Sequence, residues 1–282
     1  MKKLKFDKNK YGKNILIDTV DMSNFNPGSQ QVSPNFYTIA FLKKSSGDFL
    51  INQSTINLSS NTILFIPPGS TTNIEKSLFK DGIWIFFEGE FLDYFFNDKF
   101  FTFKFDFFHS VNSCFHIKLE KLIFEELFKI VEDIHHEIRN QSVDSEHVLR
   151  ASLYLLLTKL NRKYSEVWKT NGHVIKDLRI LRFKYLLEHN IRTMQTVENF
   201  SKTLSISKTY LNKLCSAYFG KPSSEMIKER LLLEAKKEIQ FTDKDIAEIA
   251  YELNFSNPAN FNRFFKKETK LTPSQFRIEF SK

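Results

Sequence analysis

The sequence has few of the features that a secreted or membrane protein needs. Only two cysteines occur in 282 residues, Cys114 and Cys215, and neither has a neighbour at the spacing of a metal site or a redox motif. They are predicted to be reduced, buried thiols. The basic residues 1–5 are not followed by an apolar run of signal-peptide length, because Asp18 interrupts the short run at 15–17. A cytoplasmic protein with no membrane contact is expected.

Net charge is almost absent from the first part of the chain. Residues 1–170 carry 21 Lys and Arg against 20 Asp and Glu, whereas residues 171–282 carry 20 against 13, a net charge of +7 out of +8. A basic segment of this kind favours nucleic acid as a partner. An ordinary solvated surface is the alternative.

Short strand-like runs dominate residues 36–108. They lie at 36–42, 48–51, 62–66, 83–87 and 101–105, and turn signals separate them at Ser45-Ser-Gly47, Pro67-Pro-Gly-Ser70 and Asp81-Gly82. Closely spaced strands predict an antiparallel sandwich or barrel. The period then changes to that of helices, one over 119–140 and one over about 143–164. Their apolar stripes must pack on the barrel, on each other or on a second subunit.

Residues 245–267 have the pattern of two short helices joined by a tight turn. Ile246, Ile249, Ala250 and Leu253 form an apolar stripe. Asn254 follows, and Asn tolerates the left-handed conformation that ends a helix. Ser256 is predicted to cap the second helix, with Pro258 in its first turn. Phe261, Phe264 and Phe265 would face the core, leaving polar residues outside.

The same pattern occurs about fifty residues upstream. Val197, Phe200, Ser201 and Leu204 repeat the stripe, and Ser205 takes the place of Asn254. The segment Lys208-Thr-Tyr-Leu-Asn-Lys-Leu214 then stands for Pro258-Ala-Asn-Phe-Asn-Arg-Phe264. A helix over 223–240 would join the two copies across roughly 27 Å. This length approaches the roughly 34 Å between successive major-groove faces of DNA.

At these residues the chain resembles the AraC/XylS family of bacterial transcription regulators. The resemblance covers 174–280 and includes Phe261-Asn-Arg-Phe-Phe-Lys266 and Thr272-Pro-Ser274. It departs from the family where Ser205 and Asn254 replace the usual Gly. The resemblance implies that double-stranded promoter DNA and RNA polymerase are partners, that transcription is activated, and that the region 119–164 forms a homodimer.

A second resemblance concerns residues 64–92. Leu64-Phe-Ile-Pro-Pro-Gly69 and Asp81-Gly-Ile-Trp-Ile-Phe-Phe87 look like the cupin-type sensor domain of many AraC relatives. Metal-dependent cupins need several His inside the barrel. All seven His lie outside the strand-like region, namely His109, His116, His135, His136, His147, His173 and His189. No metal and no cofactor are therefore expected, and His135 and His136 are predicted to be surface residues.

We expect an α+β multidomain protein. It would have an N-terminal antiparallel β cupin-like barrel at 1–110, a helical linker and dimerisation region at 111–170, and a C-terminal all-α domain at 171–282, with helix-turn-helix units at 196–217 and 244–267. A polar joint at 169–172 would separate the domains. The predicted function is that of a non-enzymatic, sequence-specific regulator that responds to a small molecule. The alternative is an enzyme, either a cupin oxygenase or an alkyl-transfer DNA repair protein, fused to a DNA-binding module.

The candidate site residues lie on the second helix of each repeat and in the strands. Asn and Arg can pair with base edges, Thr, Ala and Pro can contact thymine methyls, and Lys can hold phosphates. The candidates for DNA binding are Lys208, Thr209, Asn212, Lys213, Pro258, Ala259, Asn260, Asn262, Arg263 and Lys266. A solvated helix face is the alternative for each. Tyr37, Thr38 and Trp84 are candidate ligand contacts, unless the barrel is filled by its own side chains.

Overall fold

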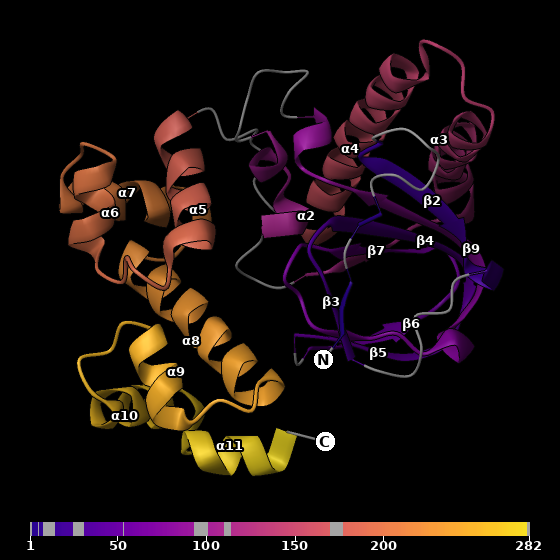
Figure 1. The fold of residues 1–282 in the computed structure, drawn as a ribbon. Coiled ribbons are helices and arrows are strands. Elements are labelled where there is room, and N and C mark those ends of the chain that lie inside the picture. Colours follow the sequence, from indigo (N-terminus) through magenta and orange to yellow (C-terminus); the bar gives the residue numbers. More distant parts are fainter. Residues whose placement is uncertain are drawn as a thin grey trace. The chain divides into compact units, whose positions relative to one another are not determined.

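The computed structural model describes residues 2–4, 6–7, 15–24, 31–52, 54–92, 101–109, 114–169 and 177–280. The chain forms two compact units, Met1–Val174 and Ile175–Lys282 (Figure 1). Of the polar joint expected at 169–172, only Lys169 is described, and it ends a helix in the left-handed conformation with φ 48°. His173 and Val174 also lie outside the described residues. Among the helices that the structure describes, none is long and apolar enough to cross a membrane.

The described residues of the N-terminal unit form two five-stranded sheets. The first has the order β1 (Lys2–Leu4), β3 (Gln31–Pro34), β8 (Thr72–Asn73), β5 (Gly47–Ile51) and β6 (Ser54–Leu58). The second has the order β10 (His116–Lys118), β7 (Thr62–Ile66), β4 (Tyr37–Ser45), β9 (Phe79–Phe87) and β2 (Ile17–Asp21). The pairs are antiparallel except for β1 with β3. The antiparallel architecture expected from the sequence is confirmed. The sequence did not indicate six of the short strands, namely β1, β2, β3, β6, β8 and β10, and four of these, β1, β2, β6 and β10, lie at sheet edges.

Two apolar cores lie on opposite faces of the second sheet. Ala40 and Leu42 of β4 belong to the core shared with the first sheet, together with Trp84. Ile39 and Phe41 point the other way and join the core beneath the helices. Because side chains alternate along a strand, a strand covered on both faces must be apolar throughout. This explains the continuous apolar runs at 39–42 in β4, 63–66 in β7 and 83–87 in β9.

Helices α3 (Lys121–Arg139) and α4 (Ser145–Trp168) cover the outer face of the second sheet (Figure 1). Leu153 and Leu156 are fully buried in the core that these helices share with the sheet. The alternative of packing within the subunit therefore holds for the greater part of both stripes. Leu122 of α3 is 83% exposed, whereas Phe124 and Phe128 occupy the face of α3 that meets the sheet.

Two details of the strand prediction are wrong. Residues 101–105 do not form a strand, because η3 (Thr102–Lys104) and the short helix α2 (Asp106–His109) occupy this segment and bury its phenylalanines. Asp81 and Gly82 are not in a turn but inside β9, opposite a register irregularity in β4. Gly82 has φ +145°, and a Cβ there would lie 1.9 Å from the Phe41 carbonyl oxygen. A glycine is therefore required at position 82 because β4 and β9 approach closely there, and not because the chain reverses direction.

Two histidines are also placed differently from the prediction. His116 lies in β10, at the edge of the second sheet. His135 is not a surface residue, since 85% of its side chain is covered, its Nδ1 is 2.8 Å from Thr19 Oγ1 and its Nε2 is 3.5 Å from Asp21. His135 faces β2, a strand that the sequence did not predict. Within the described residues, no group of three or more His, Cys, Asp and Glu could hold a metal ion.

The described part of the C-terminal unit is helical. Its helices are α5 (Leu178–Asn190), α6 (Val197–Thr203), α7 (Lys208–Phe219), α8 (Ser223–Phe241), α9 (Ile246–Glu252), α10 (Pro258–Thr269) and α11 (Pro273–Phe280). The first of these helices, α5, starts at Leu178 after the Asp177 cap. Cys215 is buried, and desolvation raises the pKa of its thiol to about 12, so that this thiol stays protonated at neutral pH.

Candidate nucleic-acid interface

Two helix-turn-helix units lie at the two ends of α8. The first consists of α6 and α7, and the second of α9 and α10 (Figure 1). Ser205 and Asn254 stand in the two turns with φ 55° and 57°. Both residues therefore adopt the left-handed conformation predicted for the positions where Gly is usual. Asn stabilises this conformation better than Ser because its side chain hydrogen-bonds locally.

Each second helix begins at a capping side chain and ends at a left-handed residue. Ser207 Oγ accepts a hydrogen bond from the Tyr210 amide at 3.1 Å. Asn257 Oδ1 accepts one from the Asn260 amide at 2.9 Å, with Pro258 in the first turn. Asn257, and not the predicted Ser256, is thus the cap of α10. The helices end at residues 220 and 270, both with φ 68°.

The inner face of α7 packs within the first unit, and the inner face of α10 packs within the second. Leu211 and Cys215 of α7, and Phe261 and Phe265 of α10, are fully buried. Phe264 is only half-buried and packs against Phe255 at 5.4 Å between ring centroids. Because the buried positions recur every three or four residues, one face of each helix is left to solvent.

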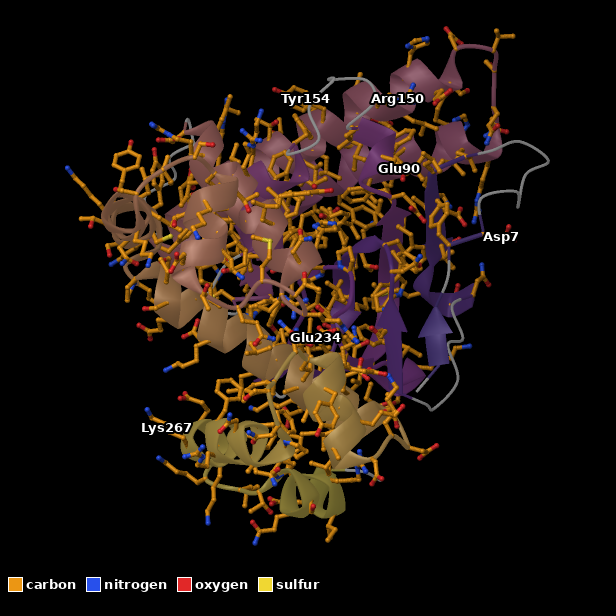
Figure 2. The ribbon with its side chains drawn as sticks, turned by 60° about the vertical axis from the view of Figure 1, so that its left-hand side comes forward. Asp7, Glu90, Arg150, Tyr154, Glu234 and Lys267 are labelled. Carbon is orange, nitrogen blue, oxygen red and sulfur yellow. The ribbon has the colours of Figure 1, made fainter. Side chains whose placement is uncertain are left out.

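The outer face of α10 carries most of the predicted DNA-binding residues of the second unit. Ala259, Asn262, Arg263 and Lys266 are exposed, while Pro258 and Asn260 are half-buried. Within the described residues the Asn262 side chain has no hydrogen-bond partner. Lys267 also projects from the last turn of this helix (Figure 2).

Asn260 is already engaged by its neighbours. Its Nδ2 donates to Ser256 Oγ at 2.6 Å, and its Oδ1 accepts from Arg263 Nη2. The amide therefore orients the guanidinium of Arg263, which remains exposed and has further N–H groups to donate. In this arrangement Arg263 is the group presented outward, and Asn260 supports it.

The outer face of α7 carries Lys208, Thr209 and Lys213, all exposed. Lys208 Nζ lies 2.8 Å from Glu198 on α6, and Lys202 Nζ lies 3.0 Å from the same carboxylate. The hydrogen bond from Lys208, followed by that from Lys202, lowers the pKa of the Glu198 carboxyl to about 2. Lys213 has no ion-pair partner in the described part of the chain, so its full charge is available for a phosphate.

Asn212 has a structural partner that the sequence analysis missed. Its Oδ1 accepts hydrogen bonds from the Ser223 amide at 3.1 Å and from the Ser223 hydroxyl at 2.6 Å. This caps α8, because Pro222 at the N-cap has no side chain able to accept a hydrogen bond. At the matching place in the second repeat, Thr272 and Gln275 cap α11 by themselves. The sequence contained a signal for this contact. Pro222 in the first repeat stands where the second repeat has the capping residue Thr272, so the cap of α8 had to come from another side chain.

The structure does not bring the three candidate ligand contacts of the N-terminal unit together. Tyr37 lies in the core beneath the helices, where its hydroxyl donates to Thr102 Oγ1 at 3.1 Å and its ring stacks on Phe87. Trp84 belongs to the opposite core, between the sheets. Thr38 is buried one residue from Tyr37 on β4, where alternation points it away from Tyr37.

Known proteins match this chain over the two helix-turn-helix units and, for some relatives, over most of its length. Residues 200–278 match a family model described as a helix-turn-helix domain. The Msm operon regulatory protein of Streptococcus mutans is 24% identical over 278 residues, covering 93% of this chain and 95% of the relative. The transposon Tn10 TetD protein of Escherichia coli is 31% identical over 104 residues, covering 37% of this chain and 72% of the relative.

Among solved structures, one match is a transcriptional regulator of Chromobacterium violaceum described as having an AraC-type DNA-binding domain. It is 23% identical and covers 37% of this chain and 94% of that one, with a TM-score of 0.34. The duplicated unit, the family model and the match to most of TetD agree with each other. The chain belongs to the AraC family of helix-turn-helix proteins and is a DNA-binding transcription regulator.

Proposed function

We propose that one chain binds a two-part site in promoter DNA, with α7 in one major groove and α10 in the next. The observation that carries this proposal is the repetition of backbone geometry in the two units. Both have a left-handed residue in the turn, a side-chain cap at the start of the second helix and a left-handed residue at its end. Matching backbones expose matching positions, so both helices offer the same face to a duplex.

The two reading helices have different roles in this proposal. Arg263, held by Asn260, contacts guanine O6 and N7 or a phosphate, and Asn262 contacts an adenine edge. Pro258 and Ala259 contact thymine methyls, and Lys266 holds a phosphate. On α7, Lys208 and Lys213 hold phosphates and Thr209 contacts a base. Asn212 keeps only its Nδ2 donor for DNA, because its oxygen is used by α8.

Binding titrations of the full chain test this proposal. The probe is a duplex enriched from a random-sequence pool by the wild-type protein. Arg263→Ala is expected to cost about 1–3 kcal/mol and to relax the preference for one base pair. Lys213→Ala should weaken binding to every duplex alike and reduce the salt slope by about one unit. If both variants are folded and bind as the wild type does, α7 and α10 do not face DNA.

We further propose that α3 and α4 supply a homodimer contact. Support comes from the apolar side chains that the unit leaves outside, among them Leu122 at 83%, Leu155 at 48% and Val148 at 42% exposed. Leu155→Asp is expected to shift a dimer to monomers in sedimentation without unfolding it. Leu153→Asp is a poor test, because Leu153 is fully buried in its own subunit and its substitution would disrupt the core. A monomeric wild type at micromolar concentration would refute the dimer.

A small organic effector that acts without a metal, and activation through RNA polymerase, complete the proposal. The similarity to the Msm operon regulatory protein, which covers 95% of that relative, supports a role in the regulation of transcription. Phe49 and Trp84 are fully buried in the core between the two sheets, and Phe65 is fully buried in the core beneath the helices. A stoichiometric transition metal that survives dialysis and alters DNA binding would count against the metal-free sensor.

A further inference from the structure

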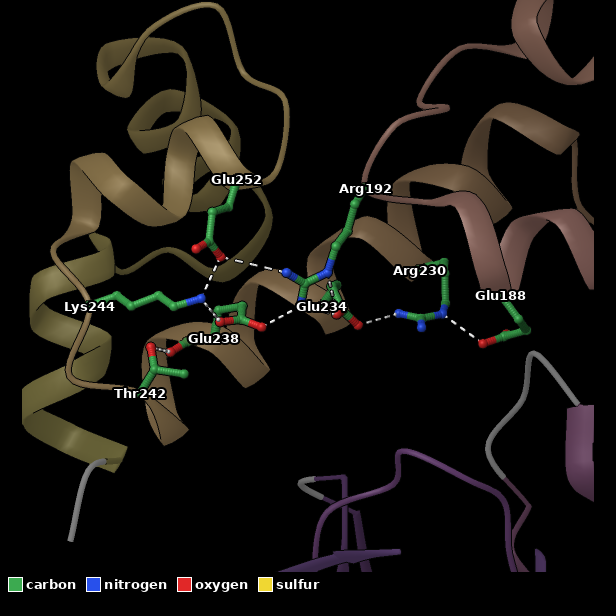
Figure 3. A network of polar contacts seen from close by, with 8 residues as sticks. All are labelled: Glu188, Arg192, Arg230, Glu234, Glu238, Thr242, Lys244 and Glu252. Atoms are coloured by element: carbon green, nitrogen blue, oxygen red, sulfur yellow. Dashed lines mark hydrogen bonds and ion pairs between the residues drawn. The ribbon is translucent and has the colours of Figure 1, made fainter. Parts of the chain in front are cut away.

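A cluster of charged side chains lies where the two helix-turn-helix units approach each other. The Arg192 cluster comprises Glu188, Arg192, Arg230, Glu234, Glu238, Lys244 and Glu252 (Figure 3). Its members come from α5, the segment after α5, α8, the segment after α8, and α9. The sequence carried a signal for it, because Arg230, Glu234 and Glu238 recur every four residues on one face of α8.

Arg192 is the member that connects separate elements. It lies between α5 and α6, directly before the first helix-turn-helix unit. Its guanidinium donates to Glu234 Oε1 from Nη2 at 2.7 Å and from Nε at 3.1 Å, and Nη2 also donates to Glu238. Its Nη1 lies 3.6 Å from Glu252 at the end of α9, in the second unit. One planar side chain thus contacts both the connecting helix and the second unit.

Two of the carboxylates in the cluster are almost fully covered. The side chains of Glu234 and Glu238 are 9% and 10% exposed. Burial alone would raise the pKa of Glu234, but the charges and hydrogen bonds of Arg230 and Arg192 lower it. A buried carboxylate is costly unless its partners keep a good geometry. The guanidinium of Arg192 is therefore held in place by groups that cannot easily turn to solvent.

A second contact joins the same two segments. Gln195 Nε2 donates to the Leu253 carbonyl, which links the residues before α6 to the end of α9. Further along, Arg277 of α11 donates to the carbonyls of Ile239 at 3.1 Å and Lys244 at 2.7 Å. The helix α8 is therefore not the sole connection between the units. The segment 192–195 therefore ties the first unit directly to the second, in addition to the contacts of α10 and α11 with α8 and with the joint 242–245 that follows it.

We propose that Arg192 is a positioning residue that fixes the rotation of the second helix-turn-helix unit relative to the first and so selects the spacing between the two halves of the DNA site. This inference rests on the proposed function. Adding one base pair between the halves moves them apart by about 3.4 Å and rotates them by about 34°. A clamped pair of units rejects such a change, whereas a pair joined only by α8 can adapt by turning.

The test uses the full chain and a duplex enriched from a random pool by the wild type, with its two halves located by footprinting. The intervening sequence is lengthened or shortened by one base pair, and affinities are measured by fluorescence anisotropy. The wild type is expected to prefer the selected spacing about tenfold. Arg192→Ala should reduce this preference to about threefold or less.

Glu252→Ala makes the test independent of overall charge. Arg192→Ala removes a positive charge and Glu252→Ala a negative one, so electrostatics alone would move their affinities in opposite directions. Clamping predicts the same loss of spacing preference in both. Lys221→Ala is the matched control, because Lys221 pairs with Glu229 of α8 at 2.7 Å without reaching α9, and it should keep the tenfold preference.

Each outcome decides between the alternatives. Folded Arg192→Ala and Glu252→Ala proteins with the wild-type spacing profile would overturn the inference, while the proposed function would stand. Should Arg192→Ala unfold, the partly exposed Glu252 gives the decisive variant. A footprint confined to one half would overturn the clamp as a determinant of spacing. If no duplex is enriched by the wild type, the proposed function fails and the inference fails with it.

Discussion

Asn212 and Asn262 occupy the same position in the two repeats, and the structure predicts that they act differently. The Asn212 amide oxygen accepts two hydrogen bonds from Ser223, a residue with no exposed surface. Asn262 is exposed, and its side chain has no hydrogen-bond partner within the described residues. Replacing each by Ala therefore separates capping of a helix from contact with DNA.

The expected magnitudes follow from these contacts. Asn212→Ala leaves the buried Ser223 amide and hydroxyl without their acceptor, which costs about 1–3 kcal/mol of unfolding free energy. Both variants gain up to about 0.7 kcal/mol because Ala is the better helix former. This gain cancels in the comparison, so that Asn212→Ala should be less stable than Asn262→Ala by about 1–3 kcal/mol. In a domain of about the size of residues 175–282, each kcal/mol corresponds to about 4–8 °C in Tm.

Thermal unfolding and DNA titration of the same variants provide the assay. Asn262→Ala should be at least as stable as the wild type, by up to about 0.7 kcal/mol, and should lose affinity for DNA. Asn212→Asp is the informative third variant, because Asp keeps the acceptor and its negative charge suits a helix N-terminus, so its stability should match the wild type. If Asn212→Ala and Asn262→Ala unfold at the same temperature, the cap contributes nothing and the assignment is refuted.

Three further predictions concern the ends of helices, the effect of acid and the effect of salt. Lys270→Gly should raise the unfolding free energy by about 0.5–1 kcal/mol, and Gly220→Ala should lower it by a similar amount, because both positions have φ 68°. The effect at Gly220 comes from the backbone alone, since a Cβ there would meet no atom within 4 Å; equal unfolding temperatures for Lys270→Gly and Lys270→Ala would contradict the prediction. The C-terminal unit should lose stability as the pH falls below 4.5, the ordinary pKa of Glu234, because the pKa of this carboxyl is lowered in the folded state; denaturant titrations should show a weaker loss in Glu234→Gln. Glu198→Gln should raise affinity for DNA at low salt by freeing Lys208, and an unchanged salt dependence would contradict that reason.

The sequence by itself determined the DNA-binding half to a large extent. Helix-turn-helix units depend on local patterns, namely an apolar stripe, a turn residue and a cap, and each of these lies within about twenty residues. The left-handed turns at Ser205 and Asn254 were predictable for this reason. The repetition of the motif supplied a second, independent reading of the same pattern.

Only the tertiary structure decided the features that depend on distant partners. The apolar run at 101–105 is equally consistent with a strand and with a buried helical turn, and packing beneath α4 selected the latter. His135 is covered because β2 lies against it, and Asn212 is a cap because Ser223 approaches it from the next helix. The Arg192 cluster joins residues up to sixty positions apart. The type of a residue defines which groups its side chain can bind, but the folded structure determines which of these groups lies in contact with it.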